Sequence, residues 1–162
     1  HLMGNAYPGA AIAGRGEVIQ AWTKGGIGQA GTYSANSVGV AAVTATIAQL
    51  KTGRPYRKIE KHGKALMAGN AAICAEQGVT AHLLGVPAMF GLVFSEKPPR
   101  DFRDAVNHND ELYTELTHGM IRRGVLPVDD ALEPWFLCAA LSDEDVATTL
   151  AVFEESLKEA KH

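Results

Sequence analysis

Apolar side chains recur at intervals of three and four residues over much of the chain after residue 55. This spacing puts them along one face of a helix and predicts three helices whose apolar faces cover a core. The first runs from Pro55 to Gly78, the second follows Asn107 and ends at Gly124, and the third follows Ser142. The core-facing positions are Tyr56, Ile59, Gly63, Leu66, Met67, Asn70 and Ile73; Leu112, Tyr113, Leu116, Met120 and Ile121; and Val146, Thr149, Leu150, Phe153 and Leu157.

Capping signals and short apolar runs complete this pattern. Ser142 with Asp145, and Asn107 with Asp110, predict the starts of two helices. Runs bounded by glycine and proline predict four strands, over 79–84, 88–94, 125–128 and 134–141, with a turn at 85–87 between the first two. The order of elements predicts an α+β domain of the α/β class, in which helices cover one face of a mainly antiparallel sheet.

The first third of the chain has a different pattern. Residues 10–13 predict a short strand and residues 17–22 a short helix, and a helix over 36–51 is apolar nearly all round. A helix of that kind must be covered on several sides. The break at 52–55 therefore predicts a domain boundary, with domains over 1–52 and 53–162.

A glycine-rich turn with three hydroxyl side chains, residues 28–36, precedes the apolar helix. Backbone N–H groups at a helix start, together with the hydroxyls of Thr32 and Ser34, favour a bound anion such as phosphate. A capped helix start without a ligand explains the same residues. The letters of residues 26–31 also fit G-x-G-x-x-G, but the buried strand before the turn and the acid about twenty residues after it are absent, which argues against a dinucleotide.

Composition limits the remaining functional classes. The hydrophobic fraction of 46% is ordinary for a globular protein, and no apolar run approaches the length of a membrane span. Residues 1–81 carry eight Lys or Arg against three acids, and the rest carries seven against fifteen. The basic positions Lys51, Arg54, Arg57, Lys58, Lys61 and Lys64 lie at helical spacing without interleaved aromatic residues, which favours a solvated helix face over a nucleic-acid surface.

Candidate metal and redox residues are sparse. Cys74 and Cys138 stand alone, which favours two reduced, buried thiols, and the histidines show no metal-ligand spacing. Trp22 and Trp135 are expected in packing. We therefore expect no metal site.

Ordered segments along the chain resemble the class III (fold type I) pyridoxal-phosphate (PLP) aminotransferases, most closely the glutamate-1-semialdehyde 2,1-aminomutase branch. Residues 29–36, QAGTYSAN, resemble that family's QAGT-x-SGNP segment. Further likenesses are NAYPGAAIAGR at 5–15, AMFGLVF at 88–94, FRDA at 102–105 with HGM at 118–120, GVLP at 124–127 and LEPWF at 132–136. The resemblance implies the C-terminal part of such an enzyme, with residues 1–52 a remnant of the PLP-binding large domain.

The resemblance also assigns roles to particular residues. It implies that Gly31 and Thr32 bind the cofactor phosphate of the neighbouring subunit in a homodimer, and that Glu133 lies near a small amino-acid or amine substrate. A surface acid beside Asp129 and Asp130 explains Glu133 equally well. Localisation in the cytoplasm, with neither nucleic acid nor membrane as a partner, is expected.

This sequence departs from the family pattern at several positions. His1 stands where the family has its Schiff-base lysine, and imidazole cannot form that imine. Ala6 and Ala35 replace glycines, Ser37 replaces a proline, and Leu141 stands where the aminomutases often have histidine. We therefore expect this chain to be inactive alone, and His1-Leu2 resembles a cloning remnant. Another class III (ω-amino acid) transaminase and a non-catalytic, self-associating module remain alternatives.

Overall fold

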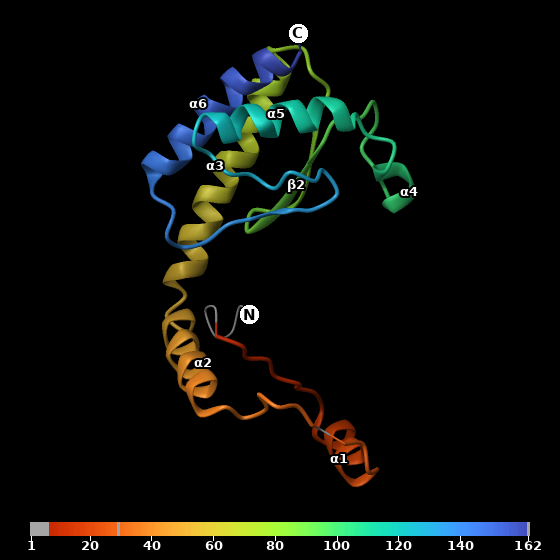
Figure 1. Cartoon of the computed structure of the whole chain (residues 1–162), viewed down its shortest axis with the longest axis vertical. Coiled ribbons are helices and arrows are strands. Elements are labelled where there is room, and N and C mark those ends of the chain that lie inside the picture. The colour runs from red at the N-terminus through yellow and green to blue at the C-terminus, as the bar shows by residue number, and fades with distance from the viewer. Residues whose placement is uncertain (1–6, 29, 162) are drawn as a thin grey trace. The chain divides into compact units, whose positions relative to one another are not determined.

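A computed structural model of the chain describes residues 7–28 and 30–161 (Figure 1). The contacts divide the chain into two compact units, an N-terminal unit that ends at Arg54 and a C-terminal unit that begins at Pro55. Each unit is described by itself. The expected positions His1 and Ala6 lie outside the described residues, as does Gln29.

The N-terminal unit consists of two helices and extended segments. Helix α1 spans Gly16–Lys24 and α2 spans Ser37–Leu50, which confirms both predicted helices. The strand predicted over 10–13 is wrong, because these residues are extended without pairing. A strand needs a neighbour to satisfy its backbone groups, and none of the described residues supplies one.

The C-terminal unit contains the three predicted long helices. They are α3, Arg54–Glu76; α5, Asp110–Arg122; and α6, Asp143–Ala160, of which α5 and α6 pack side by side (Figure 1). The predicted capping box of α6 is present, with Ser142 and Asp145 bonded reciprocally.

The predicted start of α5 is two residues too early. The carboxamide of Asn107 donates to the carbonyl of Arg103 at 2.8 Å, at the end of an unpredicted short helix, α4, Phe102–Ala105. Asn109 instead caps α5 by accepting from Leu112 N–H at 3.1 Å. Asn107 therefore bonds at the end of α4 and Asn109 caps the start of α5. The sequence spacing alone does not show which asparagine has which role.

A small antiparallel sheet lies against these helices, in the order β1-β2-β3. Strand β1 spans His82–Val86, β2 spans Met89–Val93 and β3 spans Trp135–Phe136. Val86 pairs with Met89, so the turn falls at residues 87–88 and the predicted turn at 85–87 is wrong. Gly85 instead lies inside β1 with a φ of 103°, a conformation that favours glycine.

The other two predicted strands are also corrected. Residues 125–128 form no strand, and only two residues of the run 134–141 pair, as β3. Pro127 and Pro134 cannot donate to a ladder, and the carbonyl of Val128 is taken by the Tyr113 hydroxyl at 2.9 Å. The segment from 125 to 134 is therefore an irregular loop attached to α5.

One hydrophobic core joins these elements. The sheet contributes Phe90 and Leu92, and each of the three long helices contributes buried apolar side chains. The helix members are Leu66 and Cys74 from α3, Tyr113, Leu116 and Met120 from α5, and Val146, Phe153 and Leu157 from α6. Cys74 and Trp135 are buried as expected, but Cys138 is exposed, so the expectation of two buried thiols is half wrong.

The predicted fold class is confirmed: an antiparallel sheet is packed with helices in an α/β arrangement. The assignment of residues 1–52 to a remnant of a larger domain stays a prediction. Within the described residues, no helix combines the length and apolar character needed to cross a membrane.

Candidate functional site

The glycine-rich turn ahead of α2 forms two consecutive tight turns. Ser34 N–H donates to the carbonyl of Gly31 at 2.9 Å, and Asn36 N–H donates to that of Tyr33 at 3.1 Å. The Asn36 side chain then caps α2 by accepting from Gly39 N–H at 3.0 Å. The sequence leaves two candidates for this cap, Asn36 and Ser34, and the structure uses Asn36.

A hollow of about 820 Å³ opens beside this turn. Gly31, Thr32 and Ser34 line it, together with residues 8–11 and the first two turns of α2. The extended segment approaches α2 closely at Gly39, where a Cβ atom would lie 2.8 Å from the carbonyl oxygen of Pro8. A side chain at position 39 would therefore push the segment away from the helix.

The residues around this hollow fit a phosphate group. Gly31 and Thr32 are both exposed to solvent. The N-terminus of α2 contributes its positive dipole end, and Thr32 and Ser34 add hydroxyl donors. The sequence holds no Asp or Glu between Glu17 and Glu60, so no carboxylate of this segment repels an anion.

Ala35 adds strain to the same turn. Its φ of 56° makes it the one non-glycine residue with positive φ in the part of the chain that the structure describes. A side chain in this left-handed region costs about 1 kcal/mol relative to glycine. The substitution of glycine by alanine noted in the sequence therefore falls where glycine would be favoured.

Glu133, the second predicted site residue, lies in the C-terminal unit at the end of the irregular loop 125–134. Its side chain is exposed, and its N–H donates to the carbonyl of Asp130 at 3.1 Å. The Asp130 carboxylate accepts from Leu132 N–H at 2.8 Å, so Asp130 shapes the turn that presents Glu133. Ala131, which is buried, anchors this turn to the core.

The loop is also held by a buried hydrogen-bonded pair that the sequence did not single out. The Trp135 indole donates to the Tyr113 hydroxyl at 3.0 Å, and that hydroxyl donates to the Val128 carbonyl. The ring of Trp135 packs against Phe90 with centroids 5.6 Å apart. Helical spacing assigned Tyr113 to the core correctly, but spacing carries no information about the partner of its hydroxyl.

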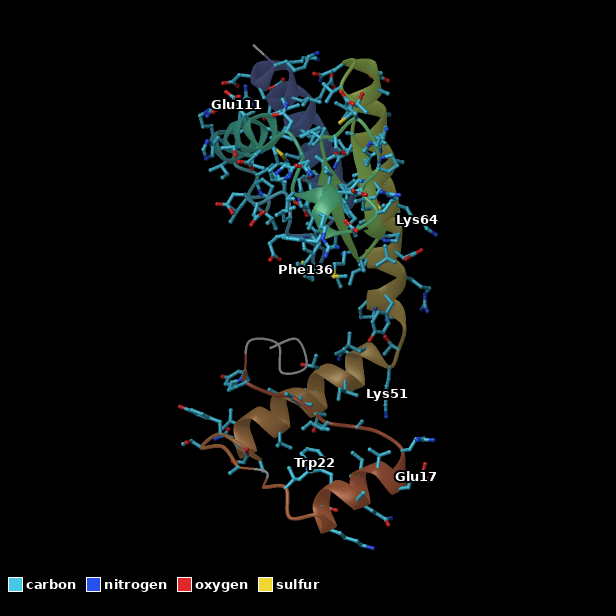
Figure 2. The ribbon with its side chains drawn as sticks, turned by 90° about the vertical axis from the view of Figure 1, so that its right-hand side faces the viewer. Glu17, Trp22, Lys51, Lys64, Glu111 and Phe136 are labelled. Carbon is cyan, nitrogen blue, oxygen red and sulfur yellow. The ribbon has the colours of Figure 1, made fainter. Side chains whose placement is uncertain are left out.

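A charged cluster joins α3 to α6. Lys61 and His62 both contact the carboxylate of Asp143, the first residue of α6, and the His62 Nε2 to Asp143 Oδ1 distance is 2.9 Å. Hydrogen bonds from Lys61 and then His62 hold the pKa of Asp143 below its ordinary value. Lys64 pairs with Glu60 on the same helix face, and Figure 2 shows Lys64 pointing outward from α3.

The structure also describes the basic stripe, the histidine, cysteine and acidic side chains, and Trp22, which the sequence analysis considered as further candidates. Part of the basic stripe is engaged in ion pairs on a solvated surface, where such pairs add little stability. In residues 7–28 and 30–161, no group of three or more His, Cys, Asp or Glu could hold a metal ion. Trp22 is half-buried in α1.

The two predicted site regions therefore lie in different units. Gly31 and Thr32 belong to the N-terminal unit and Glu133 to the C-terminal unit. The structure describes an exposed, hydrogen-bonded turn in the first region and a loop held to the core in the second, each within its own unit.

No protein-family model matches the chain. Curated relatives do: the chain is 34% identical over 155 residues to a glutamate-1-semialdehyde 2,1-aminomutase of Nitrosospira multiformis, covering 95% of this chain and 36% of that protein. The aminomutase of Nitrosomonas europaea is 34% identical over 152 residues, covering 93% and 35%. The chain thus spans about a third of the length of these relatives.

Solved structures agree in fold. A glutamate-1-semialdehyde aminomutase from Pseudomonas aeruginosa PAO1 superposes with a TM-score of 0.73 at 25% identity, covering 96% of this chain and 32% of that one. The FumI protein of Sphingopyxis sp. MTA144, solved with PLP, gives a TM-score of 0.83 at 21% identity, covering 97% and 34%.

The likeness in sequence extends over nearly the whole chain, and both structures share its fold. These findings confirm the resemblance drawn from the sequence and are consistent with the C-terminal part of a class III aminotransferase. Over nearly its whole length the chain is therefore similar to part of the glutamate-1-semialdehyde 2,1-aminomutases, and it spans about a third of the length of those relatives.

Proposed function

We propose that this chain is the C-terminal part of a PLP-dependent aminotransferase or aminomutase that resembles glutamate-1-semialdehyde 2,1-aminomutase. The observation that carries the proposal is the 34% identity over 95% of the chain, which includes the exposed turn at the N-terminus of α2. In this proposal residues 1–52 belong to the large domain and residues 53–162 form the small domain.

In the assembled enzyme, Gly31 and Thr32 bind the phosphate of the cofactor held by the partner subunit. The Thr32 hydroxyl and the N–H groups of Gly31 and Thr32 would donate to the phosphate oxygens, and the dipole of α2 would stabilise their charge. The bound cofactor supplies an electron sink for moving an amino group. Glu133 faces the substrate amine, where a carboxylate pairs with an ammonium group and fixes its orientation.

Alone, the chain is proposed to be inactive. In this proposal His1 takes the position of the family's Schiff-base lysine, and the chain spans only about a third of the length of the relatives that it matches. Mixing the chain with PLP and reducing with borohydride should leave no specific lysine modified. A stable adduct on one particular lysine, located by mass spectrometry, contradicts this part of the proposal.

A chimera tests the proposed function directly. The segment of the Nitrosospira multiformis aminomutase that matches residues 7–161 is replaced by those residues of this chain, so that the parent keeps its own Schiff-base lysine, and amino-group transfer is assayed with PLP. We expect the chimera to bind the cofactor and to turn over, with the parent protein as the positive control. A chimera that folds and dimerises but neither binds PLP nor transfers an amino group contradicts the proposal.

A different class III transaminase is the second candidate, and Leu141 is the observation that favours it. This half-buried leucine lines a groove of the C-terminal unit where the aminomutase pattern often has histidine. An apolar side chain cannot donate a hydrogen bond to a polar substrate group. Assays of the chimera with glutamate-1-semialdehyde and with ω-amino acids separate the two candidates, and Leu141→His should shift the preference towards the semialdehyde.

A further inference from the structure

The loop 125–134, which carries Glu133, has no regular structure of its own and is held to the protein at a few points. Val125 N–H donates to the carbonyl of Met120 at 3.0 Å where the loop leaves α5. Pairing of Phe90 with Trp135 fixes the other end in the sheet. Between these ends, most of the loop's backbone groups make no ladder bonds.

One hydroxyl connects the two halves of this loop. Tyr113 of α5 is fully buried, and its oxygen lies 2.9 Å from the carbonyl oxygen of Val128 and 3.0 Å from the indole nitrogen of Trp135. Val128 lies in the first half of the loop and Trp135 follows its last residue. The same atom therefore fixes the separation of the loop's two sides.

The chemistry of the three groups determines the direction of both bonds. An indole N–H can only donate and a carbonyl oxygen can only accept, so the central group must accept from one and donate to the other. Among aromatic side chains that also fill a core, only tyrosine has a hydroxyl able to do both. Burial raises the pKa of this hydroxyl, which keeps it protonated and able to donate.

The loop that this hydroxyl holds also forms one wall of an open groove. Residues 124–128 and 135–137 line the groove together with Leu66 of α3 and Thr149 of α6. Phe136, which Figure 2 labels at the edge of the C-terminal unit, is 63% exposed there. A change in the separation of Val128 and Trp135 would therefore move the groove wall and Glu133 together.

We propose that Tyr113 is a positioning residue: its hydroxyl joins Val128 to Trp135 and thereby holds the loop in the conformation that presents Glu133. The importance of that conformation for the substrate rests on the proposed function, but the effect on the loop does not. Tyr113→Phe keeps the ring that fills the core and removes only the hydroxyl, which leaves the Val128 carbonyl and the Trp135 indole without their partner.

Amide hydrogen exchange of the full chain tests the inference. We expect Tyr113→Phe to raise the exchange rate of residues 125–134 about tenfold, because two buried hydrogen bonds are lost, while amides of α3 and α6 change much less. Tyr56→Phe is the matched control, since Tyr56 lies on α3 with 56% of its surface exposed. Unchanged exchange in the loop, or equal acceleration in α3, α6 and the loop, would overturn the inference.

A double-substitution cycle sharpens the test. If Tyr113 and Trp135 act through one bond, adding Trp135→Phe to Tyr113→Phe should raise the exchange rate of the loop amides little further. If the two substitutions instead multiply their effects on that rate, the result argues against the shared hydroxyl. In the chimera described above, Tyr113→Phe should raise the KM for the amine more than it lowers kcat.

The same chimera separates the inference from the proposed role of Glu133. A loosened loop in Tyr113→Phe together with an unchanged amine KM in Glu133→Gln supports the inference and contradicts the role of Glu133. A loop that stays protected in Tyr113→Phe overturns the inference, whatever Glu133→Gln does.

Discussion

At the scale of single residues, Ala35 is a strained position in the turn that is proposed to bind phosphate. We predict that Ala35→Gly stabilises the start of α2 by up to about 1 kcal/mol, because glycine adopts positive φ without a Cβ penalty. Amide exchange of the first turns of α2 measures the effect.

Ala45→Gly is the matched control, since Ala45 is exposed in the middle of the same helix. It should destabilise α2 by about 0.5–1 kcal/mol because glycine is a poor helix former. Equal loss of protection in both variants would contradict the account of strain at Ala35.

At the scale of elements, Gly63 sets how closely the turn between β1 and β2 approaches α3. A Cβ atom on Gly63 would lie only 1.9 Å from the carbonyl oxygen of Pro87, so one of the two backbone segments would have to shift. We predict that Gly63→Ala destabilises the chain by about 1–3 kcal/mol or more, as overpacking does. Urea unfolding of the two proteins measures the difference.

Gly91→Ala serves as the control, because a Cβ atom there meets nothing within 4 Å. It should change the free energy of unfolding much less. A Gly63→Ala variant that is as stable as Gly91→Ala would show that the turn does not pack on α3 as described.

The contacts of Asp143 predict how acid affects the junction of α3 and α6. Its pKa is lowered by Lys61 first and by His62 second, so the ionised carboxylate favours the folded state. This stabilisation is present above the ordinary pKa of 3.8 and is lost as the pH falls through the lowered value. Asp143→Asn should therefore reduce stability at neutral pH and make its loss in acid shallower.

Urea midpoints measured between about pH 3 and about pH 7 test this prediction. Glu144→Gln is the control, because Glu144 is an exposed neighbour on the same helix turn without an ion pair among the described residues. Identical pH profiles for Asp143→Asn and the unchanged chain would contradict the proposed linkage.

The sequence predicted helices far better than strands, for a reason visible in particular residues. Helical bonds are local, so the spacing of Leu112, Leu116 and Met120 and the capping box at Ser142 were enough to place α5 and α6. Strand pairing depends on distant partners. The apolar run 125–128 looked like a strand, but its Val128 carbonyl bonds to the Tyr113 side chain, and no local pattern reports such a contact.

In the candidate site too, the sequence predicted local features better than those that depend on distant contacts. The turn before α2 follows from the local sequence and agrees with the structure, which uses Asn36 of the two possible caps, Asn36 and Ser34. The positive φ of Ala35 and the hydrogen bonds of Tyr113 that hold the loop carrying Glu133 do not follow from the local sequence, because both depend on the folded backbone.

At the scale of the whole molecule, the two units differ in how much they bury. The C-terminal unit has a continuous core, whereas in the described part of the N-terminal unit only Gly39 is buried. Val38 and Val40 of the apolar helix α2 are more than half exposed. Apolar surface of this extent usually marks an interface, which supports the proposed pairing of subunits.

We therefore predict that the chain self-associates through α2. Sedimentation at increasing concentration should show dimers or larger species, and Val38→Lys should shift the distribution towards the monomer by burying a charge in the contact. Ile121→Lys, at an exposed apolar position on α5, is the control and should leave the association unchanged. A wild-type chain that stays monomeric at high concentration contradicts this prediction.

The turn of Gly31 and Thr32 is proposed to bind a cofactor phosphate, and the affinity of the chimera for PLP measures that binding. Thr32→Val should weaken PLP binding about tenfold or more, because a hydrogen bond to a charged oxygen contributes about 1.5–3 kcal/mol. Thr23→Val, which removes an exposed hydroxyl that bonds within α1, should leave the affinity unchanged. Equal PLP affinities in the two variants would contradict the claim.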